Sequence, residues 1–101
     1  MAVVKIKFLP IEMMMGMYRP DSEKFVKDAL AAGLYKEESE LFVVNGDSQD
    51  AAEEVFDLTN NPGRQDEREE KYGRGRSLSV GDVVVVGEEQ WLCCSFGWKE
   101  V

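Results

Sequence analysis

The chain has 101 residues, of which 44% are hydrophobic and 32% are charged, a composition typical of one ordered globular domain spanning residues 1–101. It contains no histidine, which excludes histidine triads, histidine general bases and the commonest zinc ligand, and its net charge of −8 disfavours direct nucleic-acid binding. No apolar run approaches the ~20 residues of a membrane span, and the opening MAVVKIKFLP lacks a signal peptide's apolar core, so we expect a cytoplasmic protein that binds no membrane.

The first half of the chain predicts two strands with a helix between them. Over residues 2–8, apolar residues alternate with lysines, which is typical of a strand with one buried face. After a methionine-rich loop, apolar residues at helical spacing predict a helix over residues 22–32. The run ELFVV at residues 40–44 predicts a second, buried strand, which ends at an Asn-Gly turn.

The second half predicts a helix followed by a hairpin. The helix starts at Asp47 or Ser48 and ends in the sequence NNPG. Its inward side is expected to consist of Ala51, Ala52, Val55, Phe56 and Leu58. The polar stretch RQDEREEK is either a short exposed helix or a charged loop, and the runs VVVV and QWLCCSF then predict a β-hairpin. We expect the core there to be filled by Trp91, Phe96 and Trp98.

The expected order of elements, β-α-β-α-β-β, predicts an α+β fold. We expect a small mixed or antiparallel sheet of about four strands, with both helices packed on one of its faces. If the first two strands are parallel, the connection between them should be right-handed.

Negative charge is concentrated in the middle of the chain, because residues 37–63 contain eight acidic residues and no lysine or arginine. In the second predicted helix, four carboxylates recur at i, i+3, i+4 and i+7 and form one stripe. This stripe is either a solvated face, or a surface that docks on a basic partner or imitates nucleic-acid phosphates. The residues expected to bind the partner are Asp50, Glu53, Glu54 and Asp57, with Glu37, Glu38 and Glu40 as auxiliary charge.

Positive charge follows directly downstream, where residues 64–76 hold five of the twelve basic residues. Glycines and arginine forks are also used to bind phosphate, so this stretch is an alternative anion-binding site. Its candidate residues are Arg64, Arg68, Tyr72, Arg74 and Arg76. Four interleaved acids leave a net charge of only +1, which favours pairing of the arginines with the acidic helix or with their own neighbours.

The remaining residues that could carry chemistry are interpreted as structural. The methionines of residues 13–17 have no histidine or nearby cysteine beside them, so we expect them to cover the core or contact a partner rather than bind copper(I). Cys93 and Cys94 are adjacent in an expected strand, where a mutual disulfide would be strained, so we expect reduced and packed thiols. The sequence predicts no catalytic residue, no metal and no cofactor.

The stretch LTNNPGRQDEREEKYGRGRSLSVGDVVVV, Leu58–Val86, resembles the YodL-like group of small bacterial and phage proteins, which carry a similar SLSVGDVV element and a final GW or GF. The resemblance implies a family found on plasmids, phages and related mobile elements, with no catalytic residues to carry over. More weakly, SLSVGDVVVV is similar to the strand entry of small RNA-binding barrels of the ASCH and PUA type. Within the element, the serines and Asp82 suit hydrogen bonding in a tight turn, and Gly81 permits an unusual backbone angle.

These observations lead to one main hypothesis and one alternative, and a third, a carboxylate-dependent hydrolase, has the weakest support because no motif singles out a pair of acids. The main hypothesis is a non-enzymatic inhibitor or modulator from a mobile element, which docks its acidic helix on the basic surface of a host protein. Such a partner would be a defence nuclease or another nucleic-acid-binding factor, as for antirestriction and anti-CRISPR proteins. The alternative is a nucleic-acid or nucleotide-binding module that uses residues 64–76.

Overall fold

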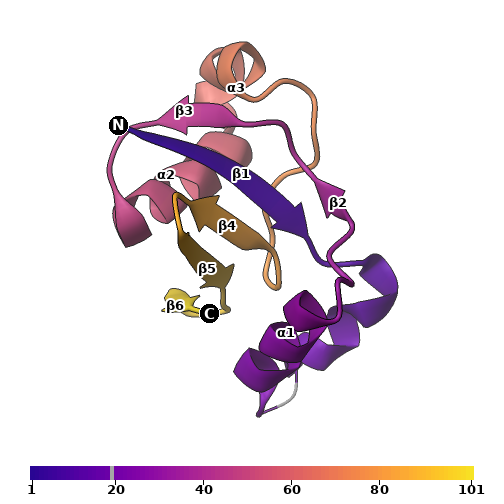
Figure 1. The fold of residues 1–101 in the computed structure, drawn as a ribbon. Helices are drawn as coiled ribbons and strands as arrows, with labels where there is room; N and C mark the ends of the chain where they lie inside the picture. Colours follow the sequence, from indigo (N-terminus) through magenta and orange to yellow (C-terminus); the bar gives the residue numbers. More distant parts are fainter. Residues whose placement is uncertain (19) are drawn as a thin grey trace.

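The structure is a computed structural model and describes residues 1–18 and 20–101. In this part of the chain the fold is α+β, as expected, with helices packed against an antiparallel sheet (Figure 1). The strands are β1 (Ala2–Phe8), β2 (Glu37–Glu38), β3 (Phe42–Val44), β4 (Val83–Val86), β5 (Glu89–Cys93) and β6 (Trp98–Glu100). The helices are α1 (Ser22–Ala31), α2 (Ser48–Asn60) and α3 (Gln65–Lys71), with short 3-10 helices η1 (Ile11–Tyr18) and η2 (Pro62–Arg64).

All strand pairs of the sheet are antiparallel, and the order across it is β2-β1-β4-β5-β6, with β3 also paired to β1. Val4 pairs with Phe42 of β3 and with Val86 of β4, so β3 and β4 lie on opposite sides of β1. Lys7 pairs in the same way with β2 on one side and β4 on the other. β2 and β3 therefore form one interrupted edge strand beside β1.

The break between β2 and β3 is held by Ser39. Its backbone N–H donates to the carbonyl of Ile6 at 2.8 Å, and its Oγ accepts from the N–H of Ile6 at 2.8 Å. The edge strand therefore follows β1 from residue 37 to residue 44 with only a short interruption.

The sheet buries apolar residues on both faces, under different helices. α2 covers the face that carries Ile6 and Val84, where Val55 packs into the core. α1 and η1 cover the opposite face beyond the end of β1, where Val26 and Val83 pack together. The expectation that both helices share one face is thus corrected. Adjacent strand residues point to opposite faces, so the valine run of β4 needs cover on both sides.

The local predictions agree with the structure for both long helices but differ elsewhere. The methionine-rich segment predicted as a loop forms η1, and the strand predicted as buried over residues 40–44 is an edge strand over Phe42–Val44 with Val43 exposed. Both long helices lie where the apolar spacing placed them, and RQDEREEK contributes the short helix α3. The predicted last strand is divided into β5 and β6 by a turn in which the N–H of Cys94 donates to the carbonyl of Gly97 at 3.0 Å. Phe96 lies in this turn and is almost fully exposed, so its expected place in the core is wrong.

Candidate protein-binding site

The four carboxylates of α2 do not form one uniform anionic surface. Asp50 and Glu53 are exposed, and their carboxylates make no hydrogen bond or ion pair with any described residue. Glu54 and Asp57, on the flank that faces α3, are both bonded to Arg64. The predicted stripe is therefore split into an open pair and a neutralised pair.

Arg64 holds three carboxylates at once. It binds both oxygens of Glu54, with Nη1–Oε1 at 2.7 Å and Nη2–Oε2 at 2.8 Å, and reaches Oδ2 of Asp57 at 2.8 Å. It also binds Glu67 of α3 through Nε (2.9 Å) and Nη2 (2.8 Å), and Lys71 adds a second cation to Glu67 at 3.3 Å. The hydrogen bonds to Glu54, and then those to Glu67 and Asp57, raise the pKa of Arg64. The hydrogen bonds from Arg64 are the main cause that lowers the pKa of Glu67 to about 2.

The turn between α2 and α3 brings Arg64 back onto the acidic helix. Asn61 ends α2, and its side chain accepts a hydrogen bond from the N–H of Gly63 at 2.9 Å. Glu54 and Asp57, which were predicted to bind a partner, are thus paired with a cation of the same chain. The favoured interpretation, that the arginines pair with the acidic helix or with their own neighbours, is confirmed for Arg64.

A small hollow lies beside the open carboxylates of α2. It has a volume of about 260 Å³ and is lined by Glu53, Phe56 and Trp98 of β6. Phe56, predicted to face inward, lies at the margin of the helix's buried side and is 41% exposed. Trp98 is partly buried against the core. The apolar spacing of α2 gave Phe56 the same inward prediction as the fully buried residues. The partial exposure of its ring depends on where β6 lies, which the spacing within α2 does not encode.

The auxiliary acids lie apart from α2, along the edge strand of the sheet. Glu37 and Glu38 form β2, and Glu40 lies in the break before β3. All three are exposed, and Glu38 pairs with Lys5 of β1 at 3.0 Å. The predicted partner-binding residues therefore occupy two regions, the outer face of α2 and the sheet edge.

The proposed anion-binding residues are mostly used inside the molecule. Arg68 donates to the carbonyl of Thr59 at 2.8 Å, to Oγ of Ser77 at 3.1 Å and to the carbonyl of Gly75. The hydroxyl of Tyr72 donates to the carbonyl of Arg76 at 2.6 Å. With Arg64 held by carboxylates, Arg74 is the one of the five candidates whose side chain is exposed and makes no hydrogen bond or ion pair with another described residue.

The element SLSVGD is a turn organised around Asp82, which is fully buried. Its carboxylate accepts from the backbone N–H of Leu9 at 2.9 Å and of Ser79 at 2.8 Å, and it pairs with Arg76 at 3.1 Å. Gly81 has φ of +98°, and a Cβ there would lie 2.6 Å from a Leu9 methyl carbon. The predicted structural roles of Gly81 and Asp82 are confirmed, and the turn fastens β4 to the end of β1.

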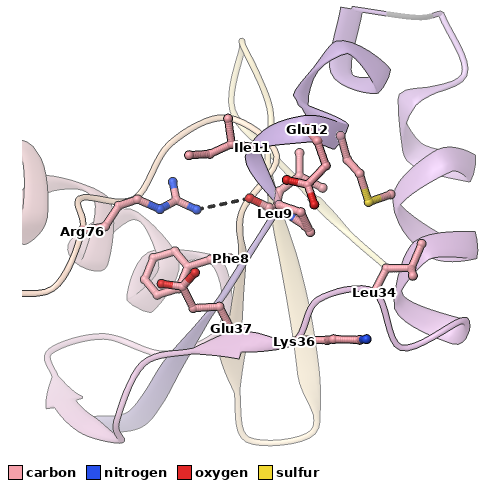
Figure 2. A pocket seen from close by; sticks show the side chains of 10 residues that line it. Phe8, Leu9, Ile11, Glu12, Leu34, Lys36, Glu37 and Arg76 are labelled. Atoms are coloured by element: carbon pink, nitrogen blue, oxygen red, sulfur yellow. Dashed lines mark hydrogen bonds between the residues drawn. The ribbon is translucent and has the colours of Figure 1, made fainter.

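A larger pocket opens beside this turn, between the end of β1, the start of η1 and the start of β2 (Figure 2). Its volume is about 540 Å³. Apolar lining is provided by Phe8, Leu9, Ile11 and Leu34, and charged side chains by Glu12, Lys36, Glu37 and Arg76. The guanidinium of Arg76 lies 4.5 Å from the centre of the Phe8 ring and is already paired with Asp82. The pocket thus has an apolar interior and a rim of balanced charge.

Both cysteines are free thiols whose pKa is raised by burial. Cys93 is buried and its pKa is raised to about 12, mainly by desolvation, and burial also raises the pKa of Cys94. No group of three or more cysteine and acidic side chains within residues 1–18 and 20–101 is placed to hold a metal ion. In the same part of the chain, no helix has the length and apolar character needed to cross a bilayer.

The fold and the site define an acidic α+β protein built on an antiparallel sheet, with carboxylates at one helix face and one sheet edge. Comparison with family models, curated proteins and solved structures found no match. The resemblance of Leu58–Val86 to the YodL-like group therefore stays a prediction.

Proposed function

We propose that this protein is a non-enzymatic binding protein that docks through the outer face of α2 on a basic surface of another protein. The observation that carries the proposal is the hollow between Glu53, Phe56 and Trp98, which lies next to unpaired carboxylates. Protein interfaces commonly combine an aromatic anchor that is buried on binding with charged residues at its rim. Here Phe56 would supply the anchor, and Asp50 and Glu53 the rim.

The ion pairs of Arg64 narrow the set of residues that can meet a partner. To bind a partner, Glu54 and Asp57 would have to break their short hydrogen bonds to the guanidinium of Arg64. New bonds to the partner would only replace these, so the net gain in binding free energy would be small. Asp50 and Glu53 have no such bonds to break. Electrostatic attraction by these two carboxylates would mainly speed association and would weaken with added salt.

Three narrower statements depend on the sequence alone and stay predictions. They are that the partner is a host defence or nucleic-acid-binding factor, that the chain imitates nucleic acid and comes from a mobile element, and that it acts in the cytoplasm. The first two rest on the charge pattern and the resemblance of Leu58–Val86.

The proposal is tested by photo-crosslinking in the native host from position 56, with benzoylphenylalanine in place of Phe56. We expect one major crosslinked protein, which Asp50→Asn/Glu53→Gln abolishes. The matched control, Glu69→Gln/Glu70→Gln, removes the same charge from exposed positions of α3 and should retain the adduct. The same adduct in both variants, or no adduct in any, would refute the proposal.

A further inference from the structure

The interrupted edge strand from Glu37 to Val44 has an open outer side. β2 and β3 pair only with β1 among the described strands, so no further strand is bonded to their far side. Leu41 is 66% exposed and Val43 is 42% exposed. Exposed strand edges with apolar side chains are sites where a further strand can add.

The charge along this edge selects the kind of strand that can add. Glu37, Glu38 and Glu40 are exposed on it, and residues 37–63 contain no basic residue. A second copy of this chain would place these acids against each other, and like charges opposite one another destabilise a strand pair. An extended segment with basic side chains would instead form cross-strand ion pairs.

The edge strand is continuous with the larger pocket, because Glu37 belongs to both. Figure 2 shows Arg76 and Phe8 on one side of this pocket and Leu34 on the other, with the start of β2 along its border. The Arg76 guanidinium is held by Asp82 and by the carbonyl of Leu9 at 3.4 Å, so it offers little to an incoming anion. The interior suits an apolar side chain.

We infer that a partner segment with alternating basic and apolar residues adds as a strand to Glu37–Val44 and places one apolar side chain in this pocket. Backbone hydrogen bonds would supply affinity, the acids of the edge would select the basic side chains, and the pocket would select the apolar one. This inference rests on the proposed function, since it specifies a mode by which the chain binds a basic protein.

The test uses the synthetic peptide Ac-KVKVKL-NH2, with backbone amide NMR and hydrogen exchange as readouts. We expect shift changes and slowed exchange within residues 37–44, and no binding of Ac-EVEVEL-NH2. N-methylation of the alternate peptide amides that face the edge strand should abolish binding, and N-methylation of the other alternate set should not. Glu37→Gln/Glu40→Gln should weaken binding by about fivefold or more, whereas Glu69→Gln/Glu70→Gln should not.

The pocket is tested separately with two exposed residues of η1. Ile11 lines the pocket and Met15 does not, and each is 75% exposed, so neither substitution should disturb the core. Ile11→Asp should weaken the peptide several-fold, and Met15→Asp should have no effect. Equal effects of the two variants would overturn the assignment of the pocket.

Failure of the edge-strand inference is distinguishable from failure of the proposed function. Undiminished binding of both N-methylated peptides, no binding of the lysine peptide, or shifts confined to α2 would overturn the inference. Crosslinking from position 56 in the Glu37→Gln/Glu40→Gln variant then reports on the outer face of α2 independently.

Discussion

Replacement of Asp82 by alanine should be among the most destabilising single changes in this protein. The carboxylate is fully buried and accepts the backbone N–H groups of Leu9 and Ser79 at 2.9 and 2.8 Å. Asp82→Ala leaves both donors without this acceptor, and the hydrogen bond from Leu9 is the fully buried one of the two. It also leaves Arg76 without its ion-pair partner.

The magnitude follows from these lost contacts. Each orphaned buried N–H group costs about 1–3 kcal/mol. Arg76 adds less, because its side chain is 34% exposed and can be hydrated. The total is about 3–5 kcal/mol, a large part of the ~5–15 kcal/mol that stabilises a typical domain. For a domain of this size, the melting temperature should fall by roughly 15–30 °C.

Urea unfolding followed by circular dichroism measures this loss. Asp82→Ala should shift the midpoint to lower urea at an unchanged slope, and Asp82→Asn, which keeps one acceptor oxygen, should lie between it and the wild type. Asp66→Ala, at an exposed position of α3, is the matched control and should stay within about 0.5 kcal/mol of the wild type. A loss below about 1 kcal/mol for Asp82→Ala would refute the reasoning.

Three further predictions test the ion pairs, the thiols and the arginines. The folded-state pKa of Glu67, about 2, lies below its ordinary value of 4.5, so its stabilisation is present above pH 4.5 and is lost as the pH falls toward 2. Unfolding midpoints at about pH 7 and about pH 3 should therefore differ less for Glu67→Gln than for the wild type, and equal differences would contradict this. In a Cys94→Ser background, native Cys93 should resist alkylation at about pH 8 and react only after unfolding, as mass spectrometry would show. Fluorescence anisotropy at low salt should detect no binding of single-stranded or duplex oligonucleotides, and binding weakened by Arg74→Ala would instead support the anion-binding alternative.

The sequence predicted those features of the candidate site that depend on spacing within one helix. It did not predict the features that depend on contacts between elements. Spacing along one helix correctly placed Asp50 and Glu53 on the outer face of α2. It could not show that Glu54 is taken by Arg64, since that contact depends on the angle at which α3 returns after the NNPG turn. In the sequence, this contact was indicated by the NNPG turn and by Arg64, which follows the turn directly. The hollow at Phe56 and the pocket at the end of β1 had no signal in the sequence, because each is formed by elements distant along the chain.

The sequence by itself determined the class of the fold and the places of β1, α1, α2 and β4. Side chains repeat their direction every two residues in a strand and every 3.6 residues in a helix, so the spacing of apolar residues shows which side chains are buried. This holds for the alternation in β1, for the apolar spacing of α1 and α2, and for the valine run of β4. These are local properties, so they can be read without knowledge of the partners.

Only the tertiary structure decided which strands pair, which face each helix covers and which charges are neutralised. The placement of β2 and β3 end to end along β1 depends on long-range hydrogen bonds, such as those between Ser39 and Ile6. The neutralisation of Glu54 and Asp57 depends on the path of the chain through Arg64. Charge interactions fall off with distance rather than with sequence separation, so the same acids are a binding surface or an internal ion pair according to how the chain folds back.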